Sequence, residues 1–268
     1  MSDAPGAEFW AAMFDVAADA YDQSEVPFFG PIADGLVRRL APAPGERVLD
    51  LGSGRGAATV PLAEAVGPRG SVTAVDASRR MVELLAATLT DRGIRHATVQ
   101  QGDAAAPPPG PYDLVSASLL LFFLPDPVAA LTAWREQLVG GGRVGVSTFA
   151  PWPESMTAVT AVLESYLPPG AEASNQMPPA FETDAGVGQL FRAAGFGDVR
   201  TERASYDIPY RDVDQFRAWS LGTALRGLWL HVPEDEVPRA LERIDAELAK
   251  FDHTLQVDIR YTLATAGA

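Results

Sequence analysis

The chain has 268 residues, of which 35 are acidic and 21 basic, and its formal net charge is −14. A chain of this length buries one sizeable core. Because phosphate groups are neutralised by clustered Lys and Arg, and no basic cluster is present, we expect neither nucleic acid nor an anionic membrane surface as a partner. Since the chain has no cysteine, disulfides, thiolate catalysis and cysteine-ligated zinc are excluded.

The N-terminal residues lack a basic start followed by an apolar run, and no segment approaches about 20 uninterrupted apolar residues. A cytoplasmic protein is therefore expected.

Strands and helices are predicted to alternate along most of the chain. Apolar residues at helical spacing, together with N-cap residues, predict helices over 9–20, 32–40, 57–66, from Ser78, from Asp126, and over 183–194, 213–222 and 234–251. Strands are predicted at 48–51, 71–75, 97–101, 113–118, 143–149, 199–208 and 254–264. Three glycines at 140–142 are expected to end the helix that starts at Asp126.

This alternation predicts an α/β fold with a mostly parallel sheet covered by helices on both faces. Residues 151–179 interrupt it with one helix flanked by prolines. Because an insertion after the carboxyl end of a strand lies over the ligand face of such a sheet, we interpret it as a lid. We expect a single domain with a core at about 41–150 and 183–268, and a cap formed by 1–40, 151–182 and 209–250.

The segment from Glu46 to Asp76 carries the strongest functional pattern. Glycines at 52, 54 and 56 follow a buried strand, and glycine lets the backbone turn tightly and lets a ligand approach closely. Asp76 ends the next strand, 24 residues after Gly52, where an acid accepts both ribose hydroxyls. The segment therefore predicts a nucleotide-type binding site.

Two kinds of nucleotide fit this pattern to different degrees. A nicotinamide site usually shows G-x-G-x-x-G, whereas the spacing here is G-x-G-x-G, with Asp50 two residues before the first glycine. An acid is poorly placed beside a pyrophosphate but suits a ligand with a cationic end. A nicotinamide-dependent oxidoreductase is thus the less well supported alternative.

With these residues in view, the chain resembles the class I S-adenosylmethionine-dependent methyltransferases, particularly the small-molecule group that includes ubiquinone- and menaquinone-biosynthesis-type and natural-product enzymes. The resemblance covers about 9–149 in motif order, and its most specific part is Val48-Leu49-Asp50-Leu51-Gly52-Ser53-Gly54-Arg55-Gly56. It implies a Rossmann-like, seven-stranded, mostly parallel sheet with a helical cap, and S-adenosylmethionine as the cofactor.

The resemblance also implies a set of cofactor-binding residues. The glycine loop and the residues after the fourth strand would lie near the methionine part, Asp50 would act through the loop or a water, and Asp103 would contact the adenine amine. Tyr21 would lie in a segment that folds over the cofactor, although a structural aromatic residue is equally consistent, and Met81 would pack near adenine or in the core. The implied residues are Tyr21, Asp50, Gly52, Ser53, Gly54, Asp76, Ala77, Met81, Gly102, Asp103, Ala104, Ser118 and Leu119.

The acceptor of the methyl group is predicted less directly. Where the family often has one or two histidines after the fourth strand, this chain has residues 121–124, LFFL, which remove the obvious general base and make the rim apolar. His231 and Tyr21 are the candidate catalytic residues, whereas His96 is expected at the surface and His253 in a structural role. Aromatic residues expected over the site suggest an apolar pocket for an aromatic, polyketide or terpenoid-like acceptor: Phe28, Phe29, Phe123, Trp152, Trp219 and Trp229.

Methyl transfer to carbon or oxygen of such a small molecule is the leading hypothesis, and a cyclase or isomerase that keeps the cofactor is the alternative. No metal is expected, because Ser116-Ala117-Ser118 offers no carboxylate for magnesium. We expect a monomer or a homodimer.

Overall fold

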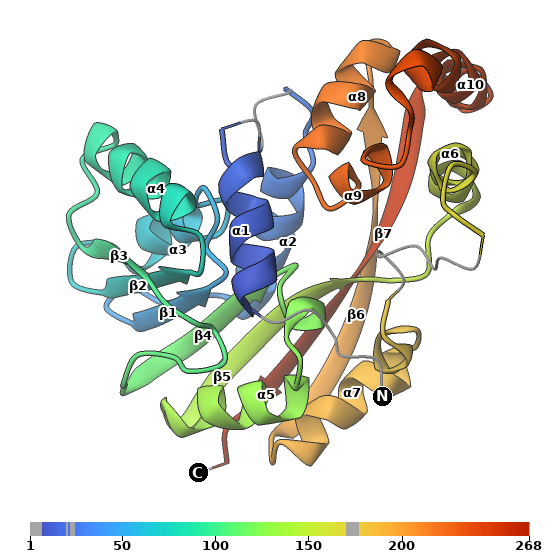
Figure 1. Ribbon diagram of the computed structural model, residues 1–268. Helices are drawn as coiled ribbons and strands as arrows, with labels where there is room; N and C mark the ends of the chain where they lie inside the picture. Colours follow the sequence, from blue (N-terminus) through green and yellow to red (C-terminus); the bar gives the residue numbers. More distant parts are fainter. Residues whose placement is uncertain (1–6, 20, 22–24, 170–176, 268) are drawn as a thin grey trace.

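A computed structural model describes residues 7–19, 21, 25–169 and 177–267. Within these residues seven strands form one sheet in the order β3-β2-β1-β4-β5-β7-β6 (Figure 1). In chain order they are β1 (Arg47–Leu51), β2 (Ser71–Asp76), β3 (Ala97–Gln101), β4 (Tyr112–Ser118), β5 (Leu138–Phe149), β6 (Gly197–Pro209) and β7 (Thr254–Thr265).

The first five strands are parallel to one another, and β7 runs antiparallel to both β5 and β6. The predicted seven-stranded, mostly parallel sheet is therefore confirmed. β1 lies between β2 and β4, so the loop that follows it opens at the middle of the carboxyl edge of the parallel strands, which is where α/β sheets bind ligands.

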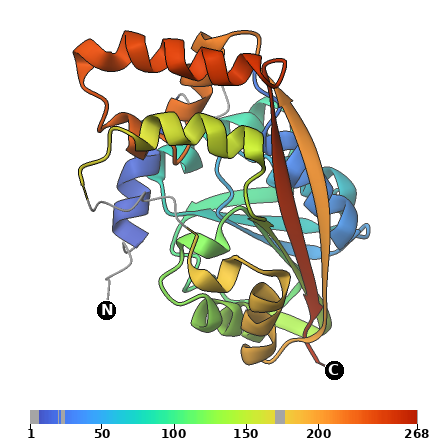
Figure 2. The same cartoon turned by 90° about the vertical axis from the view of Figure 1, so that its right-hand side faces the viewer.

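Helices cover both faces of this sheet (Figures 1 and 2). Side chains alternate between the two faces along each strand, so Val48 joins one buried apolar cluster and Leu49 the other. The first cluster includes residues of α2 (Phe29–Leu40), α3 (Thr59–Val66) and α4 (Arg79–Asp91). The second includes residues of α5 (Pro127–Glu136) and α7 (Asp184–Ala193).

Side-chain caps stabilise exposed N–H groups of the first turn at several helix starts. Ser78 accepts a hydrogen bond from the Met81 N–H at 3.1 Å, and Asp126 accepts one from the Ala129 N–H at 2.9 Å. Thr183 accepts from the Gly186 N–H at 3.0 Å. The helix starts predicted at Ser78 and Asp126 are confirmed.

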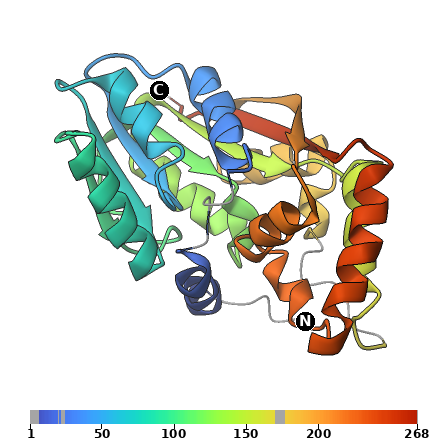
Figure 3. The same cartoon turned by 90° about the horizontal axis from the view of Figure 1, so that it is seen from above.

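The remaining helices lie at the carboxyl edge of the sheet (Figure 3). We call α6 (Glu154–Glu164), α8 (Val213–Leu221), α9 (Arg226–Trp229) and α10 (Val237–Ala249) the cap helices. α1 (Ala7–Ala17) packs against α4, and short 3-10 turns lie at Leu121–Phe123, Pro179–Phe181 and Glu234–Glu236. Residue 20, where the first helix was predicted to end, lies outside the described residues.

The prediction for the glycines at 140–142 was wrong. α5 ends at Glu136, and these glycines belong to β5, which begins at Leu138. The pairing of β5 with β4 shifts register between Tyr112 and Leu114, and Gly141 adopts a φ of +74°. These glycines therefore belong to an irregular part of a strand. Their spacing in the sequence does not distinguish this role from that of glycines at a helix end.

Arg260 in β7 is fully buried and ties the far half of the sheet to α7. Its Nε donates to Asp184 at 2.5 Å, and its Nη1 donates to the carbonyl oxygens of Phe149 and Phe181 at 3.0 and 2.9 Å.

We expect Asp184→Ala to lower the free energy of unfolding by about 2 kcal/mol, less than for a fully buried pair because the Asp184 side chain is 42% exposed. Urea denaturation measures this, with Asp91→Ala as a control on an exposed helix end. A loss below about 0.5 kcal/mol would contradict it.

Candidate active site

The glycine turn after β1 keeps the backbone open on its ligand side. Gly52, Gly54 and Gly56 have φ values of +65°, +51° and +95°, a region that disfavours other residues. A Cβ atom on Gly52 would lie 2.9 Å from Cδ1 of Leu120, and one on Gly56 would lie 2.5 Å from Cδ1 of Leu85. The turn therefore favours glycine for its conformation, and at Gly52 and Gly56 a larger residue would also displace a leucine side chain.

Asp76 at the end of β2 joins this turn to the start of α4. One carboxylate oxygen accepts a hydrogen bond from the Gly54 N–H at 2.8 Å, and the other accepts one from the Ser78 N–H at 2.9 Å. Burial raises the pKa of Asp76, whereas these two N–H groups lower it. The carboxylate is thus held in one orientation by two loops, with lone pairs left on both oxygens.

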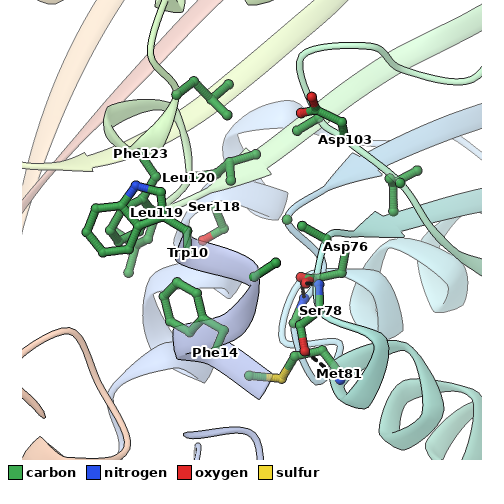
Figure 4. Close-up of a pocket in the computed structure, with 18 of the residues that line it drawn as sticks. Trp10, Phe14, Asp76, Ser78, Met81, Asp103, Ser118, Leu119, Leu120 and Phe123 are labelled. Atoms are coloured by element: carbon green, nitrogen blue, oxygen red, sulfur yellow. Dashed lines mark hydrogen bonds between the residues drawn. The ribbon is translucent and has the colours of Figure 1, made fainter. Parts of the chain in front are cut away.

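A pocket of about 760 Å³, measured out to open solvent, lies between these loops, the end of β4 and α1 (Figure 4). Eleven of the thirteen predicted cofactor residues line it: Tyr21, Gly52, Gly54, Asp76, Ala77, Met81, Gly102, Asp103, Ala104, Ser118 and Leu119. Figure 4 shows Asp76 and Asp103 on one side of this space and Phe123 on the other.

Asp50 and Ser53 do not line the pocket. Asp50 is 1% exposed and accepts a hydrogen bond from the Thr59 hydroxyl at 2.6 Å, and its burial raises its pKa to about 6. Ser53 is 6% exposed, and its N–H donates to the Val75 carbonyl at 3.0 Å. Asp50 therefore lies beneath the turn and is bonded to the start of α3, whereas Ser53 is part of the turn and is bonded to β2.

The end of β4 places a strained residue at the pocket. Leu119 adopts a φ of +53°, which is uncommon for a residue with a branched side chain and recurs at functional sites. Its N–H donates to the hydroxyl of Ser147 at 3.0 Å, and that hydroxyl also lies 3.0 Å from the Ser118 hydroxyl. These hydrogen bonds to β5 fix the backbone at the end of β4, where residues 118–120 line the pocket together with Gly52.

The N-terminal helix α1 covers one side of the pocket, which the sequence analysis did not predict at the residue level. Trp10, Ala11 and Phe14 line the pocket, and the rings of Trp10 and Phe14 lie 4.5 and 5.6 Å from that of Phe123. The helical spacing of these residues was visible in the sequence. Which of them face a ligand depends on how α1 docks.

Polar contacts hold α1 and the residues after it against the cofactor loops. Asp15 accepts hydrogen bonds from the Ser78 hydroxyl and, at 3.1 Å, from the Arg80 N–H. Arg55, inside the glycine turn, donates to the carbonyl oxygens of Ala18 and Tyr21 at 3.4 and 3.2 Å. Helix α1 and the residues after it are thus hydrogen-bonded both to the glycine turn and to the start of α4, the two segments that Asp76 joins.

Three of the six predicted acceptor residues form a series of aromatic contacts that leads from Tyr21 to α8. Phe123 lines the pocket, and Phe29 stacks on Tyr21 with ring centroids 4.2 Å apart. Phe28 contacts both Phe29 and Trp219, at 4.8 and 5.0 Å. The two remaining residues are the half-buried Trp152, 6.5 Å from Phe149, and the buried Trp229.

The histidines lie away from the pocket lining. His231 is exposed at the end of α9. His96, expected at the surface, is half-buried, and its Nε2 lies 2.8 Å from the Ala63 carbonyl oxygen. His253 lies 3.9 Å from Asp245. Of the two candidate catalytic residues, only Tyr21 borders the pocket.

Among the described residues no cluster of three His, Cys, Asp or Glu side chains is arranged to hold a metal ion. The helices of the described chain include none that is long and apolar enough to cross a membrane.

This geometry defines a class of protein. A glycine turn after the central strand, an acid at the end of the next strand and a pocket at the carboxyl edge form a nucleotide-cofactor site of the α/β type. Gly52 has a φ of +65°, which favours glycine, and both carboxylate oxygens of Asp76 keep lone pairs beside the pocket, so the residues present are compatible with an adenosine-containing cofactor.

Comparison with known proteins identifies the family. A family described as "Methyltransferase domain" matches residues 48–142. The chain is 32% identical over 237 residues to nocamycin O-methyltransferase of Saccharothrix syringae, covering 83% of this chain and 85% of that one. It is 38% identical over 166 residues to aklanonic acid methyltransferase of Streptomyces sp. (strain C5), covering 58% and 75%. The chain belongs to the S-adenosylmethionine-dependent methyltransferases, and its cofactor is S-adenosylmethionine.

Solved structures share the fold. Phosphoethanolamine N-methyltransferase 2 of Haemonchus contortus, in complex with S-adenosyl-L-methionine, superimposes with a TM-score of 0.60 at 16% identity, over 95% of this chain and 57% of that one. The (4+2)-cyclase SpnF superimposes with a TM-score of 0.61 at 17% identity, over 99% and 98%. At these identities the likeness shows the fold alone.

Replacing Gly52 with valine is expected to abolish measurable cofactor binding. The new side chain would meet Leu120 and would have to adopt a φ of +65°, so the turn would move into the pocket. Calorimetry with S-adenosylhomocysteine measures the loss. Gly67→Val is the matched control, because Gly67 has a φ of +63° and open space around it. Unchanged affinity in Gly52→Val would contradict the assignment.

Proposed function

We propose that this enzyme methylates an oxygen atom of a small, largely apolar, ring-containing metabolite. The observation that carries the proposal is the pocket wall opposite Asp76 and Asp103, which consists of Trp10, Phe14 and Phe123 and includes no histidine. Relatives named for nocamycin and aklanonic acid support a natural product as the acceptor.

S-adenosylmethionine supplies an activated methyl group, so the protein's contribution is alignment and exclusion of water. We propose that Asp76 binds the ribose hydroxyls and Asp103 the adenine amine. The backbone at Gly52 and Leu119 would orient the methionine part, and α1 would exclude water from the transfer. Asp50 would act from beneath the turn, through its shape and its negative charge.

The lack of a histidine among the described pocket-lining residues favours a particular kind of acceptor oxygen. A general base is needed only where the attacking oxygen must lose a proton early. Since the described residues of the pocket lining include no histidine, we propose an acceptor oxygen that ionises readily, such as an enol, an acidic phenol or a carboxylic acid. The relative named for aklanonic acid supports this choice. Tyr21 remains the candidate for orienting that oxygen, and we do not assign His231 a role because it is exposed and outside the pocket lining.

The test is product analysis with purified protein, S-adenosylmethionine and a panel of acceptors. We expect mass spectrometry to show gain of one methyl on aklanonic acid or a related polycyclic enol, and no gain on the same molecule with the acidic oxygen blocked. An isomer of the acceptor, formed without consumption of S-adenosylmethionine, would favour the cyclase alternative. The cytoplasmic location, the monomeric or homodimeric state and the division into core and cap stay predictions.

A further inference from the structure

Helix α1 covers the pocket from outside the core of the protein. Among its described side chains Ala17 is buried, whereas Phe9 and Val16 are 56% and 67% exposed. Neither of the two buried apolar clusters of the sheet includes a described residue of α1. A segment with few buried apolar contacts opens at a lower cost in free energy than the core does. The position of α1 therefore depends strongly on its polar contacts.

Ser78 connects the carboxylate at the end of β2 to one of these contacts. Its N–H donates to Asp76 at 2.9 Å, and its hydroxyl donates to Asp15 of α1. The same oxygen of Asp15 accepts the Arg80 N–H at 3.1 Å. Because the first turn of a helix carries a partial positive charge, it favours a carboxylate at this place. One acidic side chain of α1 thus binds the first turn of α4, next to the residue that holds Asp76.

The Arg80 side chain makes a second attachment. Its Nε and Nη2 donate to Asp19, two residues after α1, at 3.0 and 2.8 Å, and its Nη1 donates to Glu83 at 3.2 Å. The Arg80 and Asp19 side chains are 43% and 72% exposed, so water and salt weaken their attraction. We therefore expect the attachment through Asp15 to be the stronger of the two.

The helix held in this way supplies one side of the pocket. Trp10, Ala11 and Phe14 of α1 line it, and Figure 4 shows Trp10 and Phe14 across the space from Asp76. The rings of Trp10 and Phe14 also contact Phe123. Movement of α1 away from α4 would therefore open the pocket and take two of the three rings of its aromatic wall with it.

We propose that Asp15 and Arg80 are positioning residues, together called the latch, which hold α1 closed over the bound cofactor, and that release of the latch sets the rate at which the cofactor leaves. This role rests on the proposed placement of the cofactor beside Asp76 and is independent of the acceptor. The latch acts through α1, because neither residue lines the pocket. Cofactor exchange requires an open α1, and methyl transfer requires a closed one.

Surface plasmon resonance with the immobilised full chain and S-adenosylhomocysteine tests the role of Asp15. Asp15→Ala should raise the dissociation rate about tenfold, because two hydrogen bonds to a charged group are lost. Asp15→Asn should restore a rate close to that of the wild type, since an amide oxygen accepts the same two bonds. A wild-type rate in Asp15→Ala would overturn the proposal.

The same measurement tests Arg80 against a matched neighbour. Arg80→Ala should raise the dissociation rate about threefold at low salt, and high salt should remove most of this difference. Arg79→Ala is the control, because Arg79 pairs with Glu83 on its own helix, so its loss should leave the rate unchanged. Equal rates for the two variants at low salt would exclude Arg80 from the latch.

Hydrogen exchange of the full chain distinguishes a latch from a general loss of stability. At saturating S-adenosylhomocysteine we expect the amides of residues 9–17 to exchange faster in Asp15→Ala than in wild type, with α10 unchanged in both. The melting temperature should change little, because α1 lies outside the two apolar clusters. Equal protection of residues 9–17 in the two proteins would overturn the proposal.

The placement of the cofactor has its own test. If Asp76→Ala and Gly52→Val keep wild-type affinity, the proposed cofactor site fails and the latch fails with it. If those two variants lose affinity while Asp15→Ala releases S-adenosylhomocysteine at the wild-type rate, the cofactor site stands and the latch alone is wrong.

Discussion

Asp76→Ala is expected to weaken the binding of S-adenosylmethionine and S-adenosylhomocysteine about a hundredfold or more. The substitution removes the carboxylate that we propose accepts hydrogen bonds from the two ribose hydroxyls. Each such bond is worth about 1.5–3 kcal/mol, and about 3 kcal/mol corresponds to a hundredfold change in Kd. It also frees the Gly54 and Ser78 N–H groups, so the glycine turn and the start of α4 lose their common partner. Isothermal calorimetry at pH 8 measures the effect.

Two comparisons make this result specific. Asp103 is exposed and accepts a hydrogen bond from the Ala105 N–H at 2.8 Å, so Asp103→Ala should cost about tenfold or less. Asp113 pairs with Arg47 at the opposite end of the sheet, and Asp113→Ala should leave cofactor affinity unchanged. Equal affinities for wild type and Asp76→Ala would remove Asp76 from the site.

The affinity should also depend on pH through Asp76. Because its pKa in the folded protein is raised, the carboxylate takes up a proton at a higher pH than an ordinary aspartate. Binding that needs the ionised form is present above the folded pKa and is lost as the pH falls through it. Calorimetry over a pH series should show this loss in wild type.

Asp50→Asn is expected to stabilise the free protein and to weaken cofactor binding. The pKa of Asp50 is raised by burial from 3.8 to about 6, so the native state holds the proton more tightly than the unfolded chain does. Stability therefore falls as the pH rises from about 4 to 6, and the full penalty of up to about 3 kcal/mol is present above pH 6. A neutral amide avoids this penalty and can still accept the bond from Thr59.

Urea denaturation at pH 5 and pH 8 tests the stability half of this prediction, with the wild type losing stability over that interval and Asp50→Asn losing less. Calorimetry tests the other half. A negative charge beneath the turn favours a cationic ligand above it, so we expect the variant to bind S-adenosylmethionine more weakly, with a smaller change for the uncharged sulfur of S-adenosylhomocysteine. A variant less stable than wild type at pH 8 would contradict the argument. Asp113→Asn controls for a change of net charge.

Much of the fold was predictable because its signals are local. The strand at 97–101 agrees with β3, and Ser78 and Asp126 begin helices because their side chains cap neighbouring N–H groups. The glycine turn and Asp76 were visible for the same reason, since a short strand-turn-helix unit places them at one edge of the sheet whatever the rest of the chain does.

The order and spacing of neighbouring residues thus determined a mostly parallel sheet and its ligand edge, and the resemblance to a known family indicated the kind of cofactor. Only the tertiary structure decided that Asp50 lies beneath the turn, that Trp10 and Phe14 close the pocket, and that Asp15 bonds to the start of α4. Each of these depends on packing between segments far apart in the chain. No local periodicity encodes how such segments dock, so the acceptor's surroundings had to be read from the fold.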